Sequence, residues 1–240
     1  MKRADGRKSD ELRKIKIQRN FLKYAEGSCL IELGNTKVIC TATPDKNVPV
    51  FLKNSGTGWI TAEYRMLPRS AQTRIPRDKI SGRNMEIQRL VGRALRSVVD
   101  LKKIGEKTIL IDCDVIQADG GTRTASIIGG FIALVDCVHR LYKQKEVAQM
   151  CITDLLGAIS VGSLHDTKIL DLTYQEDSEA EVDMNVAMKA SGEFIEVQGT
   201  AEHGSFSEKD LSIFVKLAKA GIGQIIDLER KLFGDILSLL

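Results

Sequence analysis

The stretch TILIDCDVIQADGGTRTASIIGGFIALV, residues 108–135, carries the clearest structural pattern of this 240-residue chain. Its first nine residues are rich in β-branched side chains and partly alternate between apolar and polar, which predicts a strand. Gly120 and Gly121 interrupt that pattern, and the apolar run that follows predicts a buried helix to about residue 142. The uncharged part, residues 124–135, is too short for a membrane-spanning helix, which needs roughly twenty residues.

Strand and helix patterns continue on both sides of this stretch. Gly34-Asn35 predicts a hairpin turn between two strands, and Asn84 is the expected N-cap of the first long helix. Ser207 and Asp210 resemble a capping box that opens a later helix. Strands are predicted at residues 28–33, 36–41, 59–64, 108–116, 155–161, 168–173, 183–189 and 193–199, and helices at 84–101, from 122 to about 142 and from 208 onward. This mixed order favours an α+β or mixed α/β fold.

The amino-acid composition excludes several classes of protein. With 43% hydrophobic and 28% charged residues, the chain is neither collagen-like nor a disulfide scaffold nor intrinsically disordered. Polar residues 143–147 follow a helix and place a boundary within 145–152, so we expect two domains, 1–148 and 149–240.

The cysteines and the first twenty residues point to a soluble cytoplasmic protein without a membrane partner. The five cysteines form no C-x-x-C pair, which excludes the usual zinc and redox motifs, and we expect them to be buried apolar residues. The first twenty residues are dense in charge and lack the apolar core of a secretory signal.

The net charge of +3 is the sum of a strongly basic segment and a strongly acidic segment. Residues 65–96 hold nine basic and two acidic residues, a composition that suits phosphate groups because guanidinium matches phosphate oxygens bidentately. A solvated basic surface, or pairing with the acidic half across a subunit contact, explains the charge equally well. For the helix arginines, a solvated surface or a subunit contact is the favoured interpretation. The arginines of a Pro-containing loop instead suit an RNA backbone. The helix arginines are Arg89, Arg93 and Arg96, and the loop arginines are Arg69, Arg74 and Arg77.

Residues 171–202 carry nine acidic residues against Lys189 alone. Asp177 and Asp183 are six residues apart, and carboxylates that converge on one point bind a hard divalent ion such as Mg²⁺. A charged surface loop is the alternative.

The segment from Gly120 to Thr124 has the composition of an anion site. Glycines allow close backbone approach, a helix start offers unpaired N–H groups, and Thr122 and Arg123 add donors for phosphate oxygens. The alternative is a tight turn with a Thr cap. Arg83 is a second candidate, because it stands at the start of the other long helix.

Six stretches carry a resemblance to a known family, in preserved order over nearly the whole chain. They are AEGSCLIELGNTKVICTA, GWITAEYRMLPRS, SGRNMEIQRLVGRALR, DCDVIQADGGTRTASI, the EDSEAEVDMNV run and the EVQGTAE run. Together they resemble the bacterial ribonuclease PH family of phosphate-dependent enzymes that trim the 3′ ends of tRNA.

The resemblance implies two modules, the first like ribosomal protein S5 domain 2 and the second a smaller α/β module, in homohexameric rings built as trimers of dimers. It implies phosphate binding by Arg83, Gly121, Thr122 and Arg123, catalysis and Mg²⁺ binding by Asp177 and Asp183, and RNA guidance by Arg69, Arg74 and Arg77. Only five residues separate Arg77 from Arg83, fewer than is usual in the family, so the guide loop is expected to be short.

The implied activity is 3′-to-5′ phosphorolysis of tRNA precursors to nucleoside 5′-diphosphates, with a reverse addition reaction and a role in rRNA processing. Asp183 is either a metal ligand or the acid that protonates the leaving oxygen. Two rivals differ in chemistry: a non-catalytic RNA-binding ring subunit of the same fold, and a hydrolytic metal-dependent nuclease that needs no phosphate site.

Overall fold

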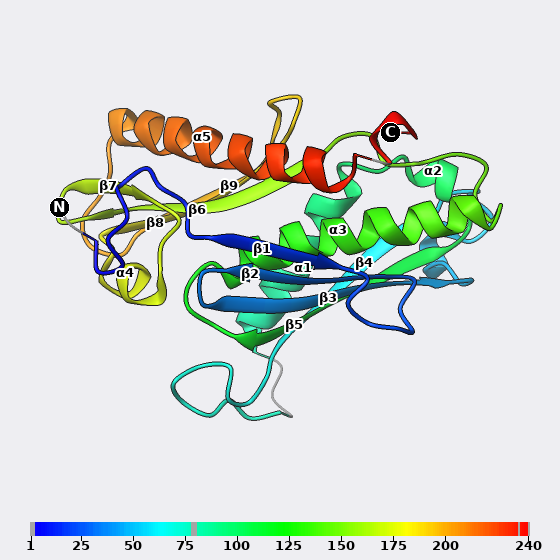
Figure 1. The fold of residues 1–240 in the computed structure, drawn as a ribbon, viewed down its shortest axis with the longest axis horizontal. Coiled ribbons are helices and arrows are strands. Elements are labelled where there is room, and N and C mark those ends of the chain that lie inside the picture. The colour runs from blue at the N-terminus through cyan, green and yellow to red at the C-terminus, as the bar shows by residue number, and fades with distance from the viewer. Residues whose placement is uncertain (1–2, 78–80, 235, 240) are drawn as a thin grey trace.

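The computed structural model describes residues 3–77, 81–234 and 236–239, and shows two β-sheets that share one apolar core (Figure 1). The first sheet contains β1 (Ile15–Arg19), β2 (Gly27–Leu33), β3 (Thr36–Asp45), β4 (Trp59–Met66) and β5 (Thr108–Gln117). Its strand order is β1-β2-β3-β5-β4, antiparallel except that β4 runs parallel to β5. The hairpin predicted at Gly34-Asn35 joins β2 to β3.

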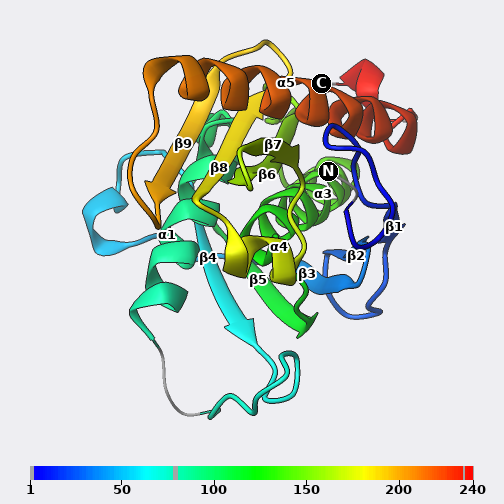
Figure 2. The same ribbon diagram turned by 90° about the vertical axis from the view of Figure 1, so that its left-hand side faces the viewer.

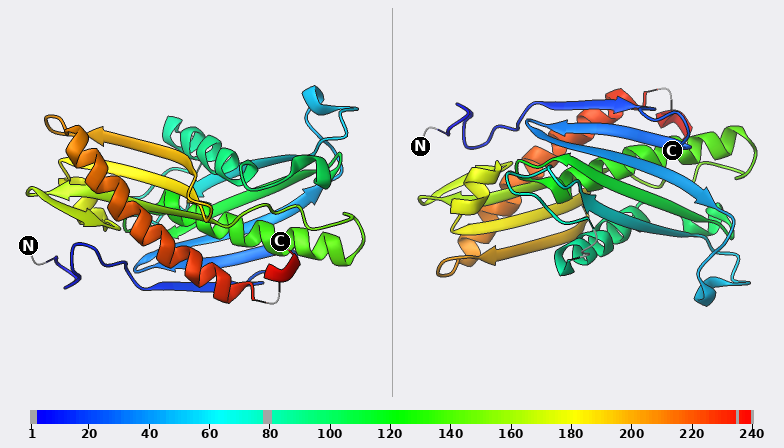
Figure 3. Two further views of the ribbon diagram at one scale, coloured as in Figure 1. Left: turned by 90° about the horizontal axis from the view of Figure 1, so that it is seen from above. Right: turned by 90° about the horizontal axis from the view of Figure 1, so that it is seen from below.

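Helices cover one face of this sheet. They are α1 (Gly82–Arg96), which packs against β4, and α3 (Thr122–Lys143), which packs against β2 and β3; the short α2 (Leu101–Ile104) follows α1, and the 3-10 turn η1 (Val50–Leu52) lies between β3 and β4. The opposite face carries no helix in the view from below (Figure 3).

The second sheet is wholly antiparallel, with the order β7-β6-β8-β9. Its strands are β6 (Leu156–Leu164), β7 (Thr167–Leu170), β8 (Val182–Lys189) and β9 (Phe194–Ala201). The long helix α5 (Glu208–Leu232) crosses this sheet diagonally (Figure 3), the short α4 (Tyr174–Glu179) lies between β7 and β8, and η2 (Leu237–Leu239) is a 3-10 turn. A mixed sheet joined to an antiparallel one makes the fold α+β, as predicted.

Helix α3 is the centre of the core, because it contacts the first sheet on one side and β6 on the other. Its length and hydropathy would suit a membrane span, yet 89% of its most apolar window is buried inside the molecule. A Cβ at Gly129 would approach Cys40 Sγ to 2.8 Å, so glycine permits the helix to lie this close to the sheet. The predictions of a buried core helix and of buried cysteines are confirmed.

Some predicted boundaries are wrong. Asn84 is not the N-cap of α1: Ser81 is, because its hydroxyl accepts the Asn84 N–H and the helix begins at Gly82. That helix ends at Arg96 rather than at residue 101. The strand predicted at 168–173 ends at Leu170, where Asp171 takes a left-handed φ of 56°. The sequence reading also missed β1 and α4.

Candidate active site

A cleft of about 690 Å³ opens where the start of α3 meets α4 and the second sheet. It collects predicted site residues from four separate parts of the chain: Arg83, Gly121, Thr122, Arg123, Asp177 and Asp183. A smaller hollow of about 350 Å³ shares four of them, Arg83, Arg123, Asp177 and Asp183. The cationic and anionic candidates therefore line the same two hollows.

The turn before α3 leaves its amide groups available. Gly121 is the N-cap of α3 with a φ of 66°, and no side chain of the described residues caps the helix. Thr124 Oγ1 donates to the Gly121 carbonyl at 2.9 Å instead of accepting a helix N–H. The alternative of a structural turn with a Thr cap is therefore wrong, and no described side chain caps the first N–H groups of α3, the kind of group that binds anions at helix starts.

The two residues after this turn are held by side chains around them. Thr122 Oγ1 accepts a hydrogen bond from the buried Tyr64 hydroxyl at 2.9 Å. Arg123 Nη1 donates to Gln198 Oε1 at 3.1 Å and lies 3.7 Å from Glu86 Oε1. Gln198 in turn donates to Glu86 at 3.0 Å. This network fixes the Arg123 guanidinium across the gap between α1, α3 and β9.

Arg83 lies in the first turn of α1 and is exposed. Its charge lowers the pKa of Asp177 against the larger effect of burial, so its guanidinium acts electrostatically on this carboxylate. Ser81 and Asn84 line the cleft beside it. Arg83 and Arg123 thus bring two cationic groups to the same cleft from different helices.

The two carboxylates come from neighbouring elements of the second half, Asp177 from α4 and Asp183 from β8. Burial raises the pKa of both groups. The pKa of Asp183 rises to about 6, first by burial and then by the charge of Asp177, while Arg123 opposes the rise. Asn185 donates to Asp183 Oδ2 at 3.3 Å, whereas the buried Asp183 Oδ1 has no hydrogen-bond partner among the described residues.

This donor set fits Mg²⁺. The ion is held in proteins by one or two carboxylates and completes its shell with water and substrate phosphate. The unpartnered Asp183 Oδ1 provides a ligand oxygen that nothing else in the described chain occupies. No group of three or more His, Cys, Asp or Glu side chains suited to a metal occurs among the described residues, so protein ligands alone would not complete a cage.

The loop after β4 projects from the body of the molecule (Figures 1 and 2). Its residues Ala71, Gln72, Thr73, Ile75 and Pro76 line the cleft. The predicted guide arginines Arg69, Arg74 and Arg77 are exposed and do not belong to that lining. Residues 78–80, where the guide loop is expected to be short, lie outside the described residues.

The three arginines on the α1 face have different surroundings. Arg93 forms an ion pair with Glu196 of β9, and Arg96 lies 4.3 Å over the Trp59 ring and donates to the Ile60 carbonyl. Arg89 is exposed. Arg96 is therefore a packing residue of the first module rather than a solvated charge.

Sequence reasoning missed Tyr174, which lines the cleft at the first residue of α4 with 54% of its surface exposed. Thr173 and Glu176 form a capping box that starts this helix, and the T-x-x-E pattern was the available signal. Tyr174 and Asp177 are three residues apart and share one face of α4.

Comparison with known families decides the relationship. Residues 11–139 match domain 1 of the 3′ exoribonuclease family, and residues 154–221 match domain 2. The chain belongs to the RNase PH family. Its two sheets correspond to the two domains of that family, and the cleft described above lies where they meet.

Solved structures share this RNase PH fold at low identity. Rrp46 from rice (Oryza sativa) superposes with a TM-score of 0.75 at 23% identity, covering 95% of this chain and 98% of that one. The Archaeoglobus fulgidus exosome with RNA bound to its active site gives a TM-score of 0.82 at 21% identity, covering 96% and 92%. An archaeal exosome core gives 0.75 at 22%, covering 96% and 90%.

Proposed function

We propose that this RNase PH family member is a phosphorolytic 3′-to-5′ exoribonuclease. One observation carries the proposal: two arginines and a free helix N-terminus meet two carboxylates in one cleft. A hydrolytic nuclease needs no site for free phosphate, whereas phosphorolysis needs a second anion next to the scissile phosphodiester. An inactive ring subunit has no use for either group.

In the proposed reaction, Arg83, Arg123 and the N–H groups at the start of α3 hold inorganic phosphate beside the last phosphodiester. A phosphate oxygen forms a bond to that phosphorus while the bond to the 3′ oxygen of the preceding nucleotide breaks. The products are a nucleoside 5′-diphosphate and an RNA one nucleotide shorter. Positioning and charge stabilisation supply most of the catalysis, which suits a site without a protein nucleophile.

The leaving 3′ oxygen must gain a proton or be stabilised as an anion. Asp183, whose pKa is raised to about 6, is protonated in a fraction of molecules near neutral pH and fits the role of proton donor. In the alternative, Asp177 and Asp183 are both ionised and would hold Mg²⁺, which when bound supplies charge stabilisation for the transition state. The same reaction in reverse adds nucleotides from diphosphates.

We assign the natural substrate as tRNA precursors with 3′ extensions, with rRNA ends as a further substrate, on the resemblance to bacterial ribonuclease PH. The assignment includes a cytoplasmic location and a homohexameric ring. The exposed apolar side chains Val50 and Phe51 beside β4, and Phe194 and Val197 on β9, support an assembly that covers them. Native mass spectrometry tests the ring by the mass of six chains.

The decisive experiment incubates a 3′-extended tRNA with the protein and Mg²⁺, with and without inorganic phosphate, and separates the products by chromatography. Nucleoside diphosphates formed only with phosphate establish the reaction. Monophosphates released without phosphate mean hydrolysis, and no cleavage in either tube means an inactive subunit. An unstructured RNA of equal length tests the tRNA preference.

Arginine variants assign the phosphate site. Arg83→Ala and Arg123→Ala should each reduce phosphorolysis about 100-fold or more, a loss typical of removing a group that stabilises transition-state charge. Arg89→Ala is the matched control, because Arg89 lies on the same helix and is exposed outside the cleft. Equal activity of all three variants would remove the phosphate site from this cleft.

A further inference from the structure

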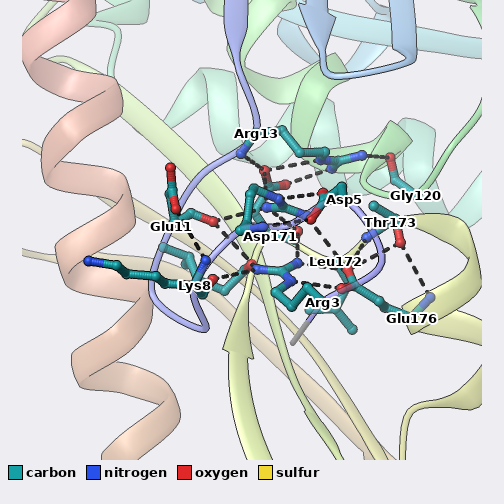
Figure 4. A network of polar contacts seen from close by, with 12 residues as sticks. Arg3, Asp5, Lys8, Glu11, Arg13, Gly120, Asp171, Leu172, Thr173 and Glu176 are labelled. Carbon is teal, nitrogen blue, oxygen red and sulfur yellow. Dashed lines mark hydrogen bonds and ion pairs between the residues drawn. The ribbon is translucent and has the colours of Figure 1, made fainter. Parts of the chain in front are cut away.

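The N-terminal segment runs beside the candidate phosphate turn, and its Arg13 side chain reaches across to Gly120 (Figure 4). Arg13 is buried there, and its guanidinium binds both carboxylate oxygens of Asp171, at 3.0 Å from Nε and 2.6 Å from Nη2. Its Nη1 donates to the Asp119 carbonyl at 2.6 Å and approaches the Gly120 carbonyl at 3.4 Å. One side chain therefore joins this turn to Asp171, the residue directly after β7.

Thr36 adds a second contact on the same turn. Its hydroxyl donates to the Gly120 carbonyl at 2.6 Å and accepts the Asp119 N–H at 2.9 Å. A Cβ at Gly121 would lie 2.8 Å from Arg13 Nη2, so the guanidinium directly backs the glycine. Arg13 and Thr36 are absent from the cleft lining, whereas Gly120 and Gly121 belong to it.

These contacts fix the direction of the turn's amides. In a planar trans peptide the N–H points opposite to the C=O. Because the carbonyls of Asp119 and Gly120 point to Arg13 and Thr36, the N–H groups of Gly120 and Gly121 point the other way. No described residue accepts a hydrogen bond from either N–H group. The arrangement turns two unpaired donors away from the N-terminal segment and toward the cleft side of the turn.

The same segment holds the carboxylate side of the site. Arg3 binds both oxygens of Glu176 at 2.7 Å, and both groups are buried. Glu176 belongs to the capping box of α4 and directly precedes Asp177. The Arg3 and Arg7 side chains also donate to the Asp171 carbonyl, at 2.9 and 3.0 Å.

We propose that Arg13 is a positioning residue for the phosphate co-substrate, which with Thr36 aims the N–H groups of the 120–121 turn at the bound anion. The inference rests on the proposed function, because it deepens the role of the same site. The guanidinium need not touch phosphate: it acts through two backbone carbonyls. The N-terminal segment is thereby part of the active-site framework, although it contributes no lining side chain.

The test measures initial rates of phosphorolysis over a range of phosphate concentrations for the wild type, Arg13→Gln and Thr36→Val. Both variants should raise the KM for phosphate about tenfold or more and leave the KM for RNA within about twofold, because misdirected donors weaken only the anion site. Thr36→Val removes no charge. If it raises the KM for phosphate as Arg13→Gln does, the cause is the direction of the N–H donors and not the loss of a positive charge. It also supplies the answer if Arg13→Gln does not fold.

Arg19→Gln is the control for lost stability, because Arg19 forms an ion pair with the buried Asp136 away from the cleft. It should not alter the KM for phosphate. A phosphate KM unchanged in Thr36→Val, or equal rises for RNA and phosphate in both variants, would overturn the proposal. A wild type without phosphate-dependent cleavage would instead overturn the proposed function. In that case phosphate binding, followed by phosphorus NMR line broadening, tests the turn without activity: both variants should bind more weakly.

Discussion

Burial, and after it the charge of Asp177 on α4, raises the pKa of Asp183 on β8 to about 6. The two carboxylates therefore oppose each other in the folded protein, and Asp183 Oδ1 has no hydrogen-bond partner among the described residues. Such strain is typical of groups selected for chemistry rather than for stability.

Asp183→Asn should therefore stabilise the protein and abolish its activity. Above the ordinary aspartate pKa of 3.8 the unfolded chain ionises Asp183 while the folded protein keeps it protonated to about pH 6, so this group lowers stability across that range. In EDTA at pH 7 we expect a gain of about 1–3 kcal/mol in urea unfolding, with phosphorolysis lost. Glu179→Gln, an exposed change on α4, should do neither. Lower stability of Asp183→Asn would mean that the charged carboxylate is well paired.

Tyr174 should serve as a stacking surface for a nucleobase near the reacting phosphate. It is exposed, lines the cleft, and shares a face of α4 with Asp177. Base-on-aromatic stacking is worth about 1–3 kcal/mol, so Tyr174→Ala should raise the KM for RNA roughly tenfold and leave the KM for phosphate unchanged. Tyr174→Phe keeps the ring and should behave as wild type. Equal RNA affinity of the Ala and Phe variants would exclude stacking.

Local sequence patterns predicted most of the strands and the buried core helix. Alternation placed the strands around Gly34-Asn35, and apolar composition placed α3 in the core. Strand β1 was missed although KIKIQ alternates, because it lies at the sheet edge and none of its residues is fully buried. The T-x-x-E pattern marks the start of α4, but the helix is only six residues long, too short to show a helical apolar periodicity.

The site was predicted as residue types and not as geometry. Arg13 and Asp171 are 158 residues apart, and no local pattern pairs one arginine with one aspartate at that separation. The unequal surroundings of Asp177 and Asp183 likewise depend on burial and on arginines from other elements. Long-range pairing is a property of the tertiary fold, so the N-terminal segment gave no functional signal.

The loop arginines should act through charge on the RNA backbone. Arg69, Arg74 and Arg77 are exposed beside the cleft, and removing one phosphate contact from single-stranded nucleic acid lowers the salt slope of binding by about 0.7. The triple change to Gln should therefore weaken RNA binding at low salt. It should also reduce the slope of log affinity against log salt concentration by about 2. The test is to measure the RNA dissociation constant at several salt concentrations between about 50 and 200 mM.

The control for the loop removes three exposed basic residues from α5, which lies on the far side of the second sheet from the loop (Figure 1). A similar loss of slope in both triple variants would mean that net charge alone sets RNA affinity. The control residues are Lys209, Lys216 and Lys231.

Glu229 on α5 should make the protein less stable as pH rises. Its side chain is fully buried, and neither carboxylate oxygen has a partner in the described chain at good hydrogen-bond geometry, although the Leu156 backbone lies near. Burial raises its pKa well above 4.5, and the Leu156 backbone offsets this only in part. Above pH 4.5 the unfolded chain releases this proton and the folded protein keeps it, so stability falls by up to about 1.4 kcal/mol per pH unit until the folded pKa is reached.

Glu229→Met keeps the bulk of this side chain and removes its titration. Its stability advantage over wild type should grow between pH 5 and pH 8 in urea unfolding, because only the wild type must hold a proton in the core. Glu208→Gln, at the exposed start of α5, should leave the wild-type pH dependence in place. Parallel pH profiles of wild type and Glu229→Met would mean that the buried carboxylate ionises with its charge compensated, and that the polar group contributes to the packing of α5 on β6.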